Sequence, residues 1–316
     1  MDGKIYEIAI LGRVVWQLHS LNNEGTVGNV TEPRSIRIID PNTKKVVTTD
    51  GVSGEMLKHI HTEIMWALDD KNNLCDACKV LNPEKFNFAI KTKKVTAKDV
   101  EDALKQALET CDICDVQGFL LERPTASRKS TVEFGWALGI PEVYRDIHTH
   151  ARHALGEKGK SESQEEQEAE GVTTQMVYHR PTRSGVYAVI SVFQPWRIGL
   201  NEARQSKYTY DADDDVRERR YKLALKAYQF LFARPEGAMT TTRLPHVEDF
   251  SGVIIYSTEP TPVPVISPLK DNYVTEIKAI TRSLDSSLKV MEFNSIVDFT
   301  TKIGQLADNR PYKMEF

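Results

Sequence analysis

The chain has 316 residues, of which 40% are hydrophobic and 27% are charged, values typical of a globular protein with a substantial core. The longest apolar stretches, residues 186–193 and 252–256, are far too short to cross a bilayer. The first five residues lack the basic flank and apolar run of a secretion signal. We therefore expect a cytoplasmic protein with no membrane partner.

The formal net charge of −4 bears on nucleic-acid binding, because affinity for a polyphosphate comes largely from Lys and Arg neutralising phosphates. Acidic residues are concentrated at 161–170 and 211–215. Basic residues gather in four short segments, 123–129, 148–153, 179–183 and 217–222. This separation permits a local basic surface, although an ordinary mixed surface explains the pattern equally well.

Apolar periodicity in the first half of the chain predicts a long strand and two helices. Alternation predicts a strand over residues 6–18, followed by a polar loop over 19–35. Ser53 is predicted to cap a helix whose apolar face runs from Met56 to Leu68. A second helix, with a capping box of Thr96 and Asp99, is predicted to end at Cys111.

The second half of the chain completes an α+β pattern. Strands are predicted at 131–139 and 186–193, and the insertion between them, 141–182, is expected to form an extended hairpin with a mobile acidic tip at 156–171. The remaining predictions are a helix at 216–232, a strand at 252–256, a helix at 273–284, a strand at 288–293 and a helix at 295–306. The acidic run 211–215 fits the N-terminus of the helix that follows it better than a metal site.

All four cysteines occur in two identical frames, Cys75-Asp-Ala-Cys78 and Cys111-Asp-Ile-Cys114. Two residues between thiolates let both sulfurs reach one ion, and two such pairs complete a closed tetrahedral zinc site with a structural role. A thioredoxin-like redox pair and disulfides are the alternatives. The first usually opens a helix after a strand, whereas Cys111 follows a helix, and the second are rare in the cytosol.

Several strings occur in the order found in one family. The first strand leads into His19-Ser20-Leu21-Asn22 and Gly28-Asn29, and Val52 to His59 (VSGEMLKH) and Asp115 to Leu120 (DVQGFL) follow. In these strings and their order the chain resembles the Cas-seven (DevR-type) proteins of type I CRISPR systems over nearly its whole length. It departs from the family at Gly237 to Pro245, which is mostly threonine, and its paired cysteine frames indicate a zinc-bearing branch.

The resemblance implies a fold, partners and a role. The fold is a single domain over 1–316, a modified RRM (ferredoxin-like) palm with a finger region at about 22–115 that carries the zinc cysteines and a thumb hairpin at about 141–182. Such subunits polymerise along a guide RNA (crRNA) beside other Cascade subunits. They support pairing of the guide with target DNA and are non-catalytic.

This role requires phosphate capture without base readout, which assigns candidate RNA contacts. Gly-rich turns, a helix N-terminus and nearby cations supply the donors. The candidates are Asn22, Asn29, Ser53, Gly54, Lys58, Arg123, Arg128, Lys129, Arg152, Met239 and Arg243. The thumb is expected to use Arg152 with its histidines at one base and residues 178–183 at the other. A metal site at His148, His150 and His153 is disfavoured, because a strand turns His153 to the opposite face.

Two other functions are open at this point. One is a metal-dependent endoribonuclease, for which Asp40 is a candidate by its place near the loop that type III relatives use, although no motif marks it. The other is a DNA-binding regulator, suggested by the autoregulator name of the family. No phosphate-binding loop, dinucleotide fingerprint or nucleophile elbow supports catalysis.

Overall fold

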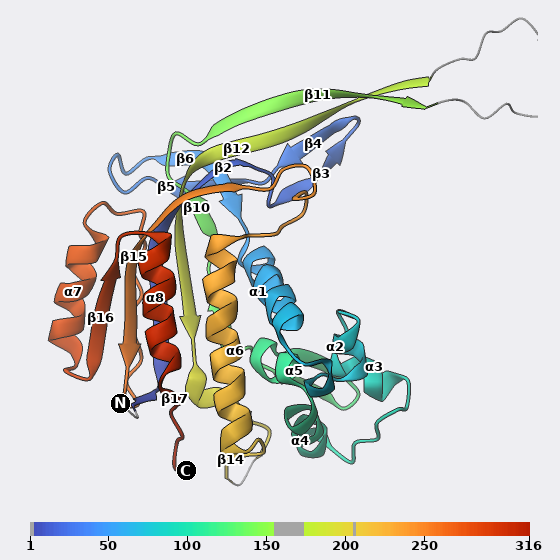
Figure 1. Ribbon diagram of the computed structural model, residues 1–316, viewed down its shortest axis with the longest axis vertical. Helices are drawn as coiled ribbons and strands as arrows, with labels where there is room; N and C mark the ends of the chain where they lie inside the picture. The colour runs from blue at the N-terminus through green and yellow to red at the C-terminus, as the bar shows by residue number, and fades with distance from the viewer. Residues whose placement is uncertain (1–2, 155–173, 205–206) are drawn as a thin grey trace, which may run out of the picture.

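The computed structural model describes residues 3–154, 174–204 and 207–316, and it describes side chains in the first two segments over 3–151 and 177–204. The expected acidic tip at 156–171 lies outside the described residues. The described chain is a mixed α+β fold built on one large sheet with helices packed on it (Figure 1). Among the described residues, no helix combines the length and apolar character needed to span a membrane.

Three long strands form the centre of the sheet. Strand β2 (Glu7–His19) lies between β12 (Thr174–Phe193) and β15 (His246–Ser257) and is antiparallel to both. The sheet continues as β16-β15-β2-β12-β10-β6-β5. Its outer strands are β16 (Leu288–Phe293), β10 (Ala137–Gly139), β6 (Val46–Val52) and β5 (Ser35–Ile39), and β9 (Val132–Phe134) also pairs with β12.

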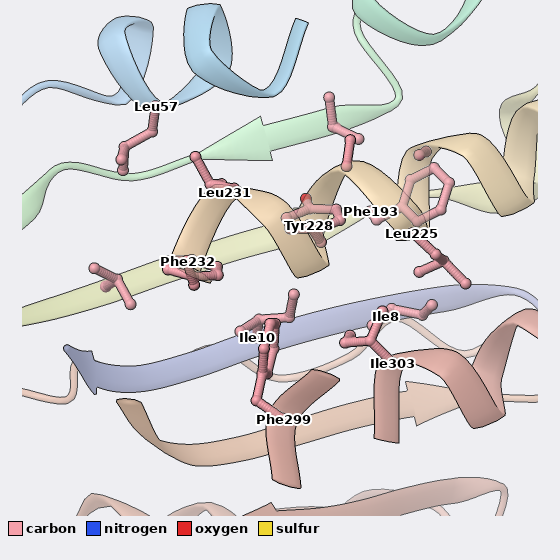
Figure 2. Close-up of a cluster of buried hydrophobic side chains, with 14 of the residues drawn as sticks. Ile8, Ile10, Leu57, Phe193, Leu225, Tyr228, Leu231, Phe232, Phe299 and Ile303 are labelled. Atoms are coloured by element: carbon pink, nitrogen blue, oxygen red, sulfur yellow. The ribbon is translucent and has the colours of Figure 1, made fainter. Parts of the chain in front are cut away.

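Helices cover both faces of the central strands because apolar residues occupy both sides of β2. Ile8 and Ile10 point toward Phe299 and Ile303 of α8 (Figure 2), whereas Ala9 and Leu11 belong to a second cluster with α7. The helices around the sheet are α1 (Gly54–Leu68), α6 (Asp214–Ala233), α7 (Tyr273–Leu284) and α8 (Ile296–Ala307). This two-sided core fixes the platform on which the remaining elements are mounted.

A small helical unit packs beside α1 and α6. We call residues 71–128 the cysteine module. Its elements are the 3-10 turn Lys71–Asn73, α2 (Asp76–Lys79), α3 (Phe86–Lys91), α4 (Val100–Thr110), α5 (Asp112–Gln117) and the hairpin of β7 (Phe119–Glu122) and β8 (Thr125–Arg128). The four cysteines and the apolar residues of these helices form a core of their own.

Two hairpins extend from one end of the sheet. The β11–β12 hairpin is formed by β11 (Tyr144–Ala154), which pairs with β12 from Ser184 to Thr174. The shorter hairpin of β3 (Asn23–Val27) and β4 (Val30–Pro33) lies against it (Figure 1). Short pairs elsewhere are β1 (Lys4–Ile5) with β17 (Arg310–Pro311) and β13 (Leu200–Asn201) with β14 (Thr209–Tyr210), and Pro195–Arg197 is a 3-10 turn.

The structure differs from the sequence predictions at three places. The predicted loop 19–35 contains β3 and β4. These strands are mostly polar, so they lack the alternation of apolar and polar residues by which strands were predicted. The predicted strand 131–139 is divided into β9 and β10, and between them a Cβ on Gly135 would lie 2.4 Å from Ile190. The N-cap of α4 is Asp99, whose carboxylate accepts from the Asp102 amide at 2.9 Å, and not Thr96.

Candidate metal centre and nucleic-acid surface

The four cysteines come together in the interior of the cysteine module. Cys75 caps α2 and Cys78 lies within it, while Cys111 joins α4 to α5 and Cys114 lies in α5. All four are buried, and their sulfurs lie within 4.8 Å of one another. The Cys114 Sγ lies 3.8 Å from that of Cys75 and 3.6 Å from that of Cys78. Within the described residues, this is the one such group of metal-ligating side chains.

These distances fit a tetrahedral ion. A zinc–sulfur distance of about 2.3 Å places the four sulfurs of a tetrahedron about 3.8 Å apart. The observed separations are too long for a disulfide bond, which is about 2.05 Å, and the four thiols are free. Full burial of Cys111 and Cys114 also disfavours a redox pair, which needs access to solvent. The donor set is therefore that of a closed metal site.

A buried network of ion pairs fastens the cysteine module to α6. Asp112 and Asp115 flank Cys114 in the sequence, and both accept hydrogen bonds from the Arg220 guanidinium, at 2.7 and 2.8 Å. Arg219 also bonds to Asp112, but its side chain is 42% exposed, whereas that of Arg220 is 1% exposed. Asp112 and Asp115 thus link the candidate metal centre to α6.

The same network corrects the prediction for Arg128. Its guanidinium donates to Asp115 at 2.7 Å, to Glu202 at 2.8 Å and to the carbonyl oxygen of Arg197 at 2.6 Å. The side chain is fully buried. Arg128 is therefore committed to the interior and is not available to a phosphate. Arg128 lies in a short basic segment, 123–129, which predicts an exposed cation. Nothing in that segment indicated that Asp115 would be its ion-pair partner.

The neighbouring cations Arg123 and Lys129 remain at the surface. Arg123 lies in the exposed turn between β7 and β8, and Lys129 is exposed and paired with Glu133. An exposed ion pair contributes little to stability, so the Lys129 ammonium can exchange Glu133 for another anion at small cost. Arg123 belongs to the cysteine module, and Lys129 follows the last residue of the module in the chain.

The residues predicted at the N-terminus of α1 have structural duties. Ser53 is the N-cap, and its hydroxyl accepts from the Met56 amide at 3.2 Å. The Asn22 side chain accepts from the Ser53 amide at 2.9 Å, which joins the end of β2 to the helix. A Cβ on Gly54 would lie 2.3 Å from the carbonyl oxygen of Phe134. Asn22, Ser53 and Gly54 are all buried. They therefore fix the start of α1 and do not themselves lie on the surface.

We expect Gly54→Ala to destabilise the protein by about 1–3 kcal/mol, because the added methyl group meets the β9 backbone and not a flexible side chain. Urea unfolding followed by circular dichroism measures the effect. Glu55→Asp, one residue further on at an exposed position, keeps the negative charge in the first turn of α1, so it is the control and is expected to leave the midpoint within measurement error. Equal midpoints for Gly54→Ala and the native protein would show that α1 can move away from β9.

The remaining predicted contacts gather at the base of the β11–β12 hairpin. The Asn29 amide donates to the Val177 carbonyl at 3.1 Å, and the Met239 sulfur lies 3.7 Å from the Ser20 hydroxyl. Arg243 lies 3.0 Å from the His150 ring nitrogen, between Nη2 and Nε2. The structure thus brings Asn29, Met239 and Arg243 to one end of the sheet. The Arg152 side chain lies outside the described residues.

Further aromatic and basic groups lie on this hairpin base. Tyr178 stacks on His150 with ring centroids 5.3 Å apart, and the Arg180 guanidinium lies over Tyr178 at 5.1 Å. His148 bonds to Thr182 at 2.9 Å. Stacked rings and guanidinium groups of this kind suit contacts with a single nucleic-acid strand.

Asp40 is used within a turn. Its carboxylate accepts from the Thr43 hydroxyl at 2.7 Å and from the Asn42 amide at 2.9 Å. These hydrogen bonds hold the pKa of Asp40 below its usual value, that from Thr43 being the largest cause. The residue therefore closes the β5–β6 turn, and nothing in its contacts singles it out as a general base.

With this geometry described, the chain can be compared with known proteins. The family model of the CRISPR-associated negative auto-regulator DevR/Csa2 matches residues 10–278. The chain belongs to the DevR/Csa2 family. The predicted family membership is therefore confirmed.

Solved structures resemble this DevR/Csa2 protein in fold. A chain of a "CRISPR RNA-guided surveillance complex, pre-nicking" aligns with a TM-score of 0.50 and 10% identity, over 95% of this chain and 99% of that one. A chain of a "CRISPR RNA-guided surveillance complex" aligns with a TM-score of 0.46 and 8% identity, over 96% and 99%. No curated protein matches the sequence.

The sequence analysis did not include Lys85, a cation that lines the same cavity as the predicted contact Lys58. Lys85 lies beside Lys58, and both line a cavity between α1 and the cysteine module. The two lysines are 27 positions apart and lie on unrelated elements. Only the packing of the module on α1 brings them together, so no local pattern could have paired them.

Proposed function

We propose that this DevR/Csa2 protein is a guide-RNA-binding backbone subunit of a CRISPR surveillance complex. The observation that carries the proposal is the match of the family model to residues 10–278. It is supported by the likeness in fold, over 95% of the chain, to a subunit of an RNA-guided surveillance complex. The protein coats the guide by self-association into a filament, beside other Cascade subunits, and is non-catalytic.

The division into palm, fingers and thumb belongs to the same proposal. Strands β2, β10, β12 and β15 alternate with α1 and α6 along the chain and lie in the order β15-β2-β12-β10. This order supports the proposal of a ferredoxin-like RRM palm. The finger region is about 22–115 and contains the cysteine module as far as the middle of α5. The thumb is the insertion 141–182, which contains β11 and the outer part of β12.

The proposed RNA surface has two parts. Asn29, Met239 and Arg243 contact the strand at the thumb base, with Arg152 further out on β11. Lys58, Arg123 and Lys129 supply cations on the finger side. These cations hold the phosphate backbone, while Watson–Crick pairing of the guide selects target DNA. Asn22, Ser53 and Gly54 shape the turn between the two parts.

The metal of the four-cysteine site is proposed to be structural zinc. Cys75, Cys78, Cys111 and Cys114 would hold it, and four thiolates leave no coordination position for substrate. Zinc therefore joins α2 to the α4–α5 corner and supplies no reaction step. The proposed role is to fix the module that carries Arg123 and ends next to Lys129.

Native mass spectrometry of the purified protein with guide RNA tests this function. We expect a ladder of protomers on one RNA strand, with one zinc ion per protomer. A chain that stays monomeric with guide RNA would overturn the filament proposal. Cleavage of the RNA in the presence of a divalent metal, lost in Asp40→Ala, would support the nuclease, and preference for duplex DNA would support the regulator.

The phosphate contacts can be tested by the salt dependence of RNA binding. We expect Arg243→Gln and Lys129→Gln each to weaken binding and to reduce the slope of log affinity against log salt by about 0.7, the value for one phosphate on a single strand. Arg282→Gln, an exposed cation on α7 at the other face of the sheet, is the matched control and should leave the slope unchanged. Equal slopes in all three variants would remove Arg243 and Lys129 from the surface.

A further inference from the structure

A cavity of about 560 Å³ lies between α1 and the cysteine module. One wall is the face of α1 that carries Lys58 and Thr62. The opposite wall is the segment around Leu81, Asn82, Pro83 and Lys85. Its volume is within the range of sites that hold small molecules, about 300–1,000 Å³.

Two lysines, Lys58 and Lys85, line this cavity together with one carboxylate, that of Glu55. Within the described residues, Lys58 makes no ion pair, and the Lys85 ammonium donates to the carbonyl oxygens of Gly118 at 2.6 Å and Gln117 at 3.4 Å. Burial, and then the charge of Lys85, lower the pKa of Lys58 to about 8. Glu133, which pairs with Lys129, and Glu55, which also lines the cavity, oppose this shift only in part. The sulfurs of the four-cysteine site offset part of the Lys85 charge, and Cys78 itself lines the cavity, so an anion bound there is held mainly by Lys58.

The rest of the lining suits a flat, largely apolar group with a polar edge. Leu81, Pro83 and Ile113 contribute apolar surface. The Asn82 side-chain oxygen accepts from the Glu84 amide at 2.9 Å, and its side-chain N–H groups make no hydrogen bond among the residues that the structure describes. The cavity therefore offers cations to one part of a ligand and apolar contacts with a hydrogen-bond donor to another.

We propose that this cavity is a nucleotide site, in which Lys58 and Lys85 bind the phosphate and the wall of Leu81, Pro83 and Ile113 receives the base. The nucleotide is either free or one unit of an RNA strand. The inference goes beyond the proposed filament, because a free nucleotide can occupy the site in the absence of a guide.

Calorimetric titration of the zinc-loaded, RNA-free protein tests the site. The probes are 5′-mononucleotides, the corresponding nucleosides and inorganic phosphate. We expect the mononucleotides to bind more tightly than either part alone. Lys58→Gln should weaken mononucleotide binding about tenfold, the effect of one lost charge-assisted hydrogen bond. Lys105→Gln, on an exposed face of α4, is the control and should bind as the native protein does.

A second variant separates the two halves of the site. The backbone of Leu81 has a positive φ of 52°, which asparagine tolerates, so Leu81→Asn removes apolar surface without changing the turn. It should weaken mononucleotide binding and leave phosphate binding unchanged. Unfolding curves and zinc content equal to the native values verify that both variants fold.

The outcomes distinguish this inference from the proposed filament. Displacement of the mononucleotide by single-stranded RNA identifies the source as a strand, and simultaneous binding identifies a free nucleotide; both support the site. Mononucleotide binding that is absent, or unaffected by both Lys58→Gln and Leu81→Asn, overturns it. Loss of filament formation with intact mononucleotide binding would overturn the proposed function alone.

Discussion

Chelation of the metal, or replacement of one of its ligands in Cys114→Ser, is expected to unfold the cysteine module. Structural zinc contributes about 10–16 kcal/mol of binding free energy in zinc-finger peptides, and without it the module retains only a small apolar core around buried thiols. Hydrogen exchange measured by mass spectrometry should show lost protection across 71–128. Strands β2 and β15 should stay protected, because they have their own two-sided core.

The control for this experiment is Asp76→Asn, an exposed position next to Cys75. It keeps all four ligands and should retain metal content and protection. Readdition of zinc after chelation should restore protection in the native protein and fail to do so in Cys114→Ser. Protection that is unchanged by a chelator that removes all bound metal would show that the metal has no structural role.

Replacement of Arg220 is expected to cost about 3–5 kcal/mol of unfolding free energy, the range for a buried ion pair that loses one partner. Arg220→Ala leaves Asp112 and Asp115 with fewer partners in the interior. Arg220→Met keeps most of the side-chain volume and should lose nearly as much, which would assign the effect to the lost ion pairs of Asp112 and Asp115 and not to lost packing. Equilibrium unfolding in urea measures all of these variants.

Arg219 supplies the matched comparison. It precedes Arg220, bonds to the same Asp112 and is 42% exposed on its side chain. Because exposed ion pairs contribute about 0–1 kcal/mol, Arg219→Ala should have a small effect. Equal losses for Arg219→Ala and Arg220→Ala would show that the network is held by surface charge and not by burial.

Elements were predicted correctly where a capping residue or a regular apolar spacing marks them locally in the sequence. Ser53 begins α1 as predicted, and the helix and strand bounds at 273–284 and 288–293 agree with α7 and β16. The spacing of the cysteines predicted that the two sulfurs of each pair lie together, because each pair lies on one turn. These features depend on near neighbours in the chain. That the two distant pairs meet was inferred from the chemistry of a four-thiolate zinc site and not from local spacing.

Features that depend on distant partners could not be predicted. Arg128 looks identical to Lys129 in a basic string, yet one is buried against Asp115 and the other is exposed. The turn residues Asn22 and Ser53 lie 31 positions apart and are joined by one hydrogen bond. Whether a charged side chain is buried depends on the partner that tertiary packing brings to it. A short stretch of sequence does not indicate that partner.

Strand β12 pairs with two different long strands along its length. Its first half pairs with β11 and its second half with β2, and the change occurs at a bulge between Arg183 and Gly185. Each residue of a strand advances it by about 3.3 Å, and successive side chains alternate between faces. Adding two residues to each arm beyond the bulge would therefore lengthen the reach of the hairpin by about 7 Å and keep every side chain on its face. Adding one would exchange the faces. The reach of the hairpin can thus change in steps of two residues, while the central sheet stays as it is.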